Sequence, residues 1–228
     1  KAVIVERGRF RPVTRVNMAM LESAQTQLAE DSGIPPAETV TLFEMTMRTL
    51  MSDGRIDLRD FLSRAEVVAA TGHTVLISDY FEYYRLAAYI ARYTQRDIAL
   101  VMGAPALPEL FNEAYYQKLP GGTLEAFGRL FKNDARVYVY PMRDRTTGAI
   151  VTALDYRPEG QLASLYQFLL GRGAIVPLRN YREDVLGIVS QEVIELIQHG
   201  DPSWEDMVPV QVAGAIRRRG LFGYRPDR

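Results

Sequence analysis

The sequence predicts an α/β fold, a Rossmann-like parallel sheet with helices on both faces. Short apolar runs alternate with amphipathic segments of about 10–15 residues, which is typical of successive β-α-β units. Turns rich in glycine and proline separate these segments, and no internal repeat or low-complexity linker interrupts them. The 228 residues, 47% of them hydrophobic, suffice for the core of one domain, which we expect to span 1–228.

The first half of the chain opens with a short apolar strand at 2–5 and continues with a helix at 15–30. Apolar side chains recur in that helix at helical spacing, and Gly33 with the pair Pro35–Pro36 ends it. The elements predicted next are a strand at 39–45, a helix at 57–70, a strand at 73–79, a helix at 80–93 and a strand at 97–103.

The second half keeps the alternation. Gly121 and Gly122 indicate a turn between helices and not a P-loop, because the required lysine and preceding strand are missing. The predicted elements are a helix at 108–119, a strand at 136–141, an extra strand or hairpin arm at 146–156, a helix at 161–170, a strand at 174–178, and helices at 192–199 and 210–219.

Composition excludes several classes of site. The chain has no cysteine, so disulfides, thiolate metal sites and cysteine nucleophiles are ruled out, and its two histidines cannot form a multi-histidine metal site. The net charge of −1 and the lack of a long apolar run argue against nucleic acid and membrane insertion as partners. We expect a soluble protein of the cytoplasm or another reducing compartment. Because the chain begins with Lys1, we expect it to begin either inside a longer precursor or after a removed leader.

An unusual stretch follows the first strand, with Gly8, Phe10 and Pro12 at alternate positions before a helix. Thr14 suits the N-cap of that helix, and Asn17 lies one turn later on the same face. We expect the backbone N–H groups of the first turn to form a phosphate cradle together with three cations, Arg9, Arg11 and Arg15. An ordinary strand-to-helix turn with solvated arginines remains the alternative on these residues alone.

The stretch GRFRPVTRVNMAMLESA resembles the first signature of the nicotinate/nicotinamide mononucleotide adenylyltransferases, which are nucleotidyltransferases. Gly8, Phe10 and Pro12 match it, and Thr14 matches a permitted variant of the first histidine. Asn17 stands where that family has its second histidine. The chain is also similar to uncharacterised bacterial proteins that bear the same family name.

Two further segments resemble the family in the same order along the chain. In DIALVMGAPALPELF, Gly103 matches, but Pro105 replaces an aspartate. In LGIVSQEVIELIQHG, Ser190 falls within the family's Ile-Ser-Ser/Thr motif, whereas Gln191 replaces a threonine and Ile194 replaces an arginine. The resemblance covers most of the chain except about 118–181, a divergent insertion that we regard as a surface for a second copy or a protein partner.

The resemblance implies transfer of AMP from ATP to nicotinate or nicotinamide mononucleotide in NAD biosynthesis, with Mg²⁺ accompanying the ATP and no metal held by the protein alone. It places catalytic roles at Thr14 and Asn17. It places nucleotide or phosphate binding at Gly8, Arg9, Phe10, Arg11, Pro12, Arg15, Gly103 and Ser190. An active enzyme needs charge stabilisation that Asn17 and Ile194 do not supply. We therefore favour a nucleotide-binding, regulatory or scaffold pseudoenzyme without a cofactor, with an active adenylyltransferase and a structural subunit as alternatives.

Two other features allow both a structural and a functional interpretation. Glu44 and Asp79 end strands and are placed to help hold Mg²⁺ or a ribose hydroxyl, although Asp79 also suits the N-cap of the next helix. The tyrosines at 80–93 can stack on a base, but we favour a packed helix face or subunit contact formed by Tyr80, Tyr84 and Tyr93.

Overall fold

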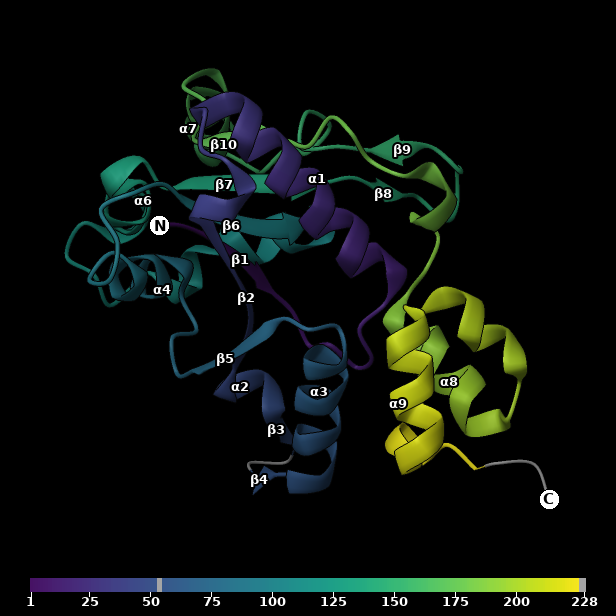
Figure 1. The fold of residues 1–228 in the computed structure, drawn as a ribbon. Helices are drawn as coiled ribbons and strands as arrows, with labels where there is room; N and C mark the ends of the chain where they lie inside the picture. The colour runs from purple at the N-terminus through teal and green to yellow at the C-terminus, as the bar shows by residue number, and fades with distance from the viewer. Residues whose placement is uncertain (53–54, 226–228) are drawn as a thin grey trace.

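A six-stranded parallel sheet forms the centre of the computed structural model, which describes residues 1–52 and 55–225 (Figure 1). Its strands lie in the order β10-β7-β6-β1-β2-β5. They are β1 (Ala2–Arg7), β2 (Thr39–Thr46), β5 (Thr74–Ser78), β6 (Ile98–Gly103), β7 (Arg136–Tyr140) and β10 (Ile175–Pro177). The chain builds the sheet outward from β1 in one direction and then from β6 in the other, which confirms the Rossmann-like prediction.

Helices cover both faces of this sheet. Side chains alternate along β1, so that Ala2 and Ile4 pack into one core while Val3 and Val5 pack into the other. The first core contains α1 (Arg15–Ser32), α3 (Leu58–Ala70), α8 (Ser190–His199) and α9 (Val210–Arg219). The second contains α4 (Tyr83–Ile90), α5 (Leu107–Leu110), α6 (Gly122–Leu130) and α7 (Leu162–Gly171).

Shorter elements connect these layers. They include α2 (Met47–Leu50) and two antiparallel pairs, β3 (Met51–Ser52) with β4 (Arg55–Ile56) and β8 (Met142–Arg143) with β9 (Ile150–Val151). The 3₁₀ turns are η1 (Pro36–Glu38), η2 (Ala104–Ala106), η3 (Glu113–Tyr115), η4 (Lys132–Asp134), η5 (Glu183–Val185), η6 (Pro202–Met207) and η7 (Leu221–Gly223).

Two predicted helices are shorter than expected, for local reasons. The helix predicted at 108–119 ends with α5 at Leu110, because the Asn112 side chain accepts a hydrogen bond from the Ala114 N–H and starts a separate 3₁₀ turn. The helix predicted at 80–93 begins only at Tyr83, with Glu82 at its N-cap. The prediction of Asp79 as the N-cap was therefore wrong.

The aromatic face of α4 also differs from the prediction. The tyrosine packed in the core is Tyr83, whereas Tyr80 and Tyr84 are only half-buried and Tyr93 is 75% exposed. Tyr83 thus turns inward, whereas Tyr80 and Tyr84 stay partly in contact with solvent. Tyr93 lies beyond the end of α4 and is not part of a packed helix face, whereas a subunit contact formed by these rings stays a prediction.

The segment 118–181 belongs to the sheet, because it supplies β7 and β10 together with α6 and α7. It exposes three large apolar side chains, Leu124 on α6, Leu154 in the turn after β9 and Phe168 on α7. Isolated exposed apolar residues of this kind are normal on a protein surface. Within the described ranges, no helix is both long enough and apolar enough to cross a membrane.

Candidate functional site: the loop after β1

The candidate site lies where the strand order reverses, between β1 and β6. In a parallel α/β sheet this is the position at which a ligand crevice forms beyond the carboxyl ends of the strands. The loop from Gly8 to Thr14 leaves β1 here and leads into the first turn of α1. Gly103 ends the neighbouring strand β6 at the same edge, as expected from the sequence.

The ring of Phe10 fills the space beside Gly8. Phe10 has a φ of 46° and is only 2% exposed, and its ring lies 5.0 Å from the ring of Phe43 in an edge-on arrangement. A Cβ atom on Gly8 would lie 2.7 Å from Cε1 of Phe10. Glycine is thus required at position 8 to accommodate this ring.

The side chain of Asn17 forms hydrogen bonds within the protein through both its oxygen and its nitrogen. Its Oδ1 accepts hydrogen bonds from the backbone N–H of Thr14 at 2.8 Å and from the Thr14 hydroxyl at 3.0 Å. Its Nδ2 donates to Oε1 of Glu6 at 2.8 Å. Thr14 is the N-cap of α1, as expected. Asn17 therefore closes the first turn of the helix and turns its amide toward the buried end of β1.

Glu6 places a carboxyl group directly behind this turn, and the sequence interpretation missed it. The side chain points to the same face of β1 as Ile4, and the residue is 1% exposed. Burial raises the pKa of Glu6 to about 8, although the hydrogen bond from Asn17 lowers it. The carboxyl is thus protonated at neutral pH. Its Oε2 is buried without a hydrogen-bond partner in the described part of the chain.

Arg7 points to the opposite face of β1 and binds the end of β5 to the sheet. Its Nε donates to Oε2 of Glu44 at 2.5 Å, and Ser78 Oγ donates to the other carboxylate oxygen of Glu44 at 2.5 Å. The rest of the guanidinium donates to the carbonyls of Tyr80 and Phe81. These bonds hold both residues outside the helix, which explains why α4 begins only at Tyr83.

This network does not suit Mg²⁺ at Glu44. The side chain is fully buried and each of its oxygens accepts a hydrogen bond within the protein, so the carboxylate is not presented to solvent as a ligand. Asp79 is exposed in the connection that follows β5. Among the described residues no cluster of three or more His, Asp or Glu side chains could hold a metal ion. The idea that Glu44 and Asp79 share a metal or a ribose in this crevice has no support in the geometry.

The three arginines of the expected phosphate cradle have different environments. Arg11 forms an ion pair with Asp60 on α3 at 2.7 Å, and Arg15 donates to the carbonyl of Asp206 at 3.1 Å. Arg9 is exposed and has no ion-pair partner within the described ranges. Pro12 is buried in the same loop, after a cis peptide bond. Of the three, only Arg9 therefore has a guanidinium without a protein partner among the described residues, at the place where the strand order reverses.

The segment LGIVSQEVIELIQHG, which resembles the family near the end of the chain, adds no cation to the loop after β1. Ile194 is 2% exposed and packs in the first core. Ser190 begins α8 and is half-buried, and no hydrogen bond or ion pair joins it to the loop after β1 in the part of the chain described. Gln191 donates to Glu195 at 3.1 Å along the same helix.

Neither a scan against protein-family models nor a search of curated proteins finds a match to this chain. Functional conclusions therefore depend on the site itself. The one sequence signal that could have revealed Glu6 and Arg7 is the adjacent opposite charges that end an apolar strand. In a sheet covered on both faces, such a pair must send one charge into each core.

Proposed function

We propose that this chain is a non-catalytic binding or scaffold protein of nucleotidyltransferase-like architecture. The observation that carries the proposal is the engagement of Asn17 with Thr14 and Glu6, which turns a candidate anion-binding turn into a self-satisfied structural one. The ring of Phe10 fills the adjacent space beside Gly8. Because the loop is filled by its own side chains, a structural role is favoured over a nucleotide site at this place.

Electrostatics argue in the same direction. Adenylyl transfer requires stabilisation of the charge on the leaving pyrophosphate, and each missing donor costs about 2.7–4 kcal/mol, or roughly 10²–10³ in rate. Asn17 is uncharged, and Ile194 is neither charged nor exposed. Above its pKa of about 8, Glu6 would add a negative charge directly behind the loop. An anionic transition state would find little stabilisation there.

The test is pyrophosphate release from Mg²⁺–ATP, with nicotinate and nicotinamide mononucleotide offered in turn to the folded protein. We expect no release above the rate without protein. Turnover at about 1 s⁻¹ or faster, within the ordinary range of enzymes, would overturn the proposal.

Arg9 decides whether any observed release belongs to the chain. It is the one arginine of the loop without a protein partner among the described residues, so Arg9→Ala should abolish genuine turnover. Lys118→Ala removes another exposed cation, away from the loop, and serves as the matched control. Release that both variants retain would identify a contaminating enzyme.

A further inference from the structure

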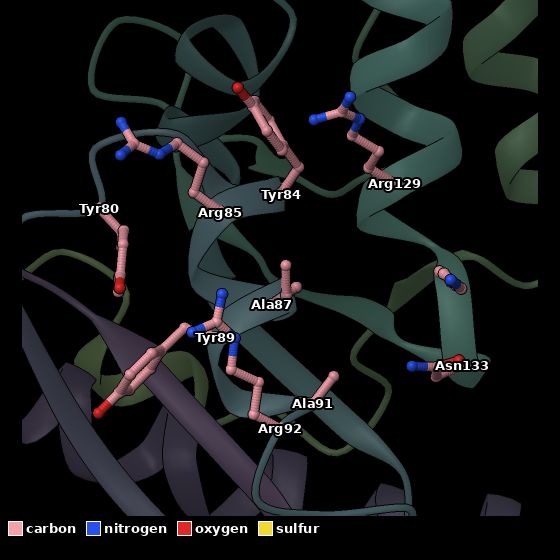
Figure 2. Close-up of a pocket in the computed structure, with 11 residues that line it drawn as sticks. Tyr80, Tyr84, Arg85, Ala87, Tyr89, Ala91, Arg92, Arg129 and Asn133 are labelled. Carbon is pink, nitrogen blue, oxygen red and sulfur yellow. The ribbon is translucent and has the colours of Figure 1, made fainter.

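A hollow of about 570 Å³ lies between α4 and α6, on the face of the sheet opposite the Asn17–Glu6 turn. Figure 2 shows Tyr84 from α4 and Arg129 from α6 on its two sides, with Tyr89 farther along α4 and Arg92 in the turn after it. Its volume falls within the usual range of small-ligand pockets, about 300–1,000 Å³. The hollow is separate from the site discussed above.

The lining of this hollow is cationic. It contains Arg85, Arg92, Arg129 and Lys132, and no lining residue is acidic. Arg85 pairs with Glu82 at 3.4 Å and Arg129 with Glu125 at 2.5 Å. Arg92 and Lys132 have no ion-pair partner in the described part of the chain. These two uncompensated charges occur in a protein whose overall net charge is −1.

Tyrosine rings form the other part of the lining. The rings of Tyr80 and Tyr89 lie 5.2 Å apart, and Tyr93 continues the row with its ring 5.2 Å from that of Tyr89. Tyr80 and Tyr89 are half-buried, so their positions are held by packing while part of each ring meets solvent. Ring faces held in this way are surfaces on which a planar base can stack.

A second hollow of about 420 Å³ adjoins the first one. It shares Tyr80, Arg85 and Tyr89 with the first and extends to the end of β5, where Asp79 is its one acidic lining residue. The tyrosines therefore lie between two connected depressions, and the cations Arg92, Arg129 and Lys132 belong only to the first.

We propose that this surface binds the base and phosphate of a nucleotide, either as a free mononucleotide or as part of a single strand. Arg92 and Lys132 bind the phosphate, since an anion there gains two charges that no protein carboxylate neutralises. The rings of Tyr80 and Tyr89 stack on the base. A second copy of the chain does not suit the surface, because a symmetric contact would set these cations against one another.

The test is fluorescence anisotropy with a labelled oligo-dT of about 12 nucleotides and, separately, a fluorescent AMP analogue. Arg92→Ala/Lys132→Ala should weaken binding about tenfold or more, and for the strand it should reduce the salt slope by about 1.4. Tyr89→Leu keeps an apolar side chain but removes the ring, and it should weaken binding by about tenfold with an unchanged salt slope.

A matched control removes the same charge from the other side of the sheet. Arg59 and Arg218 are exposed on α3 and α9, so Arg59→Ala/Arg218→Ala should bind like wild type. Circular dichroism establishes that each variant is folded. Binding of the strand but not of the AMP analogue assigns the site to single-stranded nucleic acid, and the reverse assigns it to a mononucleotide. Absence of binding of both probes at about 50 mM salt, or equal loss in the control variant, would overturn the proposal.

Discussion

Replacing Glu6 by glutamine tests whether this carboxyl group is protonated in the folded protein at neutral pH. The substitution preserves the shape of the side chain and an oxygen that can accept the hydrogen bond from Asn17. It also removes the ionisable proton, so the side chain at position 6 no longer titrates. Burial raises the pKa of Glu6 from its ordinary value of 4.5 to about 8, so within this window the folded chain retains a proton that the unfolded chain has released.

The free energy of unfolding of the wild type should therefore fall as the pH rises from 4.5 to about 8. One pKa unit corresponds to about 1.4 kcal/mol, which gives roughly 5 kcal/mol over the whole window and about 2–3 kcal/mol between about pH 5 and about pH 7. Glu6→Gln does not undergo this loss. Its stability relative to wild type should rise by about 2–3 kcal/mol between those two pH values.

Urea unfolding at both pH values measures this difference. Trp204 is the single tryptophan and is buried, so its fluorescence reports loss of the core. For an m value of about 2–3 kcal/mol/M, the difference in urea midpoint between variant and wild type should change by about 1 M between the two pH values. Glu159→Gln, at an exposed position, is the control and should keep the wild-type pH dependence. Parallel pH profiles for wild type and Glu6→Gln would refute the assignment of a protonated Glu6.

The same unfolding assay tests two further features of the site. Gly8→Ala should lower the free energy of unfolding by about 1–3 kcal/mol, because its Cβ would meet the Phe10 ring. The control Gly128→Ala, on the exposed side of α6, should raise it by up to about 1 kcal/mol. A Gly8→Ala variant as stable as wild type would show that the ring does not fill the loop. Arg7→Met should cost about 3–5 kcal/mol because it leaves the Glu44 carboxylate buried without its cation, and adding Glu44→Met should recover the part of that loss that comes from the unpaired charge. Additive losses in the double variant would count against a coupled pair.

Periodicity and end signals predicted the elements of the fold well where local and tertiary forces agree. The helix at 210–219 has the predicted bounds because Pro209 precedes it and Gly220, with a φ of 60°, ends it. The start of α4 could not be predicted, since it depends on Arg7, which lies more than 70 residues away in the chain and binds the carbonyls of Tyr80 and Phe81.

The candidate site was predictable in position but not in content. A glycine followed by an aromatic residue after the first strand indicates a special loop conformation, whatever that loop accommodates. The sequence does not specify that Phe10 adopts a positive φ and turns its ring onto Gly8, because that choice depends on packing against Phe43. Nor does spacing show that Asn17 binds Glu6, which requires α1 to lie across the end of β1.

The charged pair that ends β1 also connects the two surfaces discussed above. Alternation along the strand sends Glu6 toward α1 and Arg7 toward α4, whose first residue, Tyr83, lies under the Arg7 guanidinium at 4.4 Å. Through the carbonyl of Tyr80, Arg7 also fixes the backbone of a residue that lines the cationic hollow. A substitution at Arg7 should therefore disturb the tyrosine face even where the loop after β1 is unaffected. The end of β1 is thus a structural support for both faces of the sheet, through Glu6 on one side and Arg7 on the other.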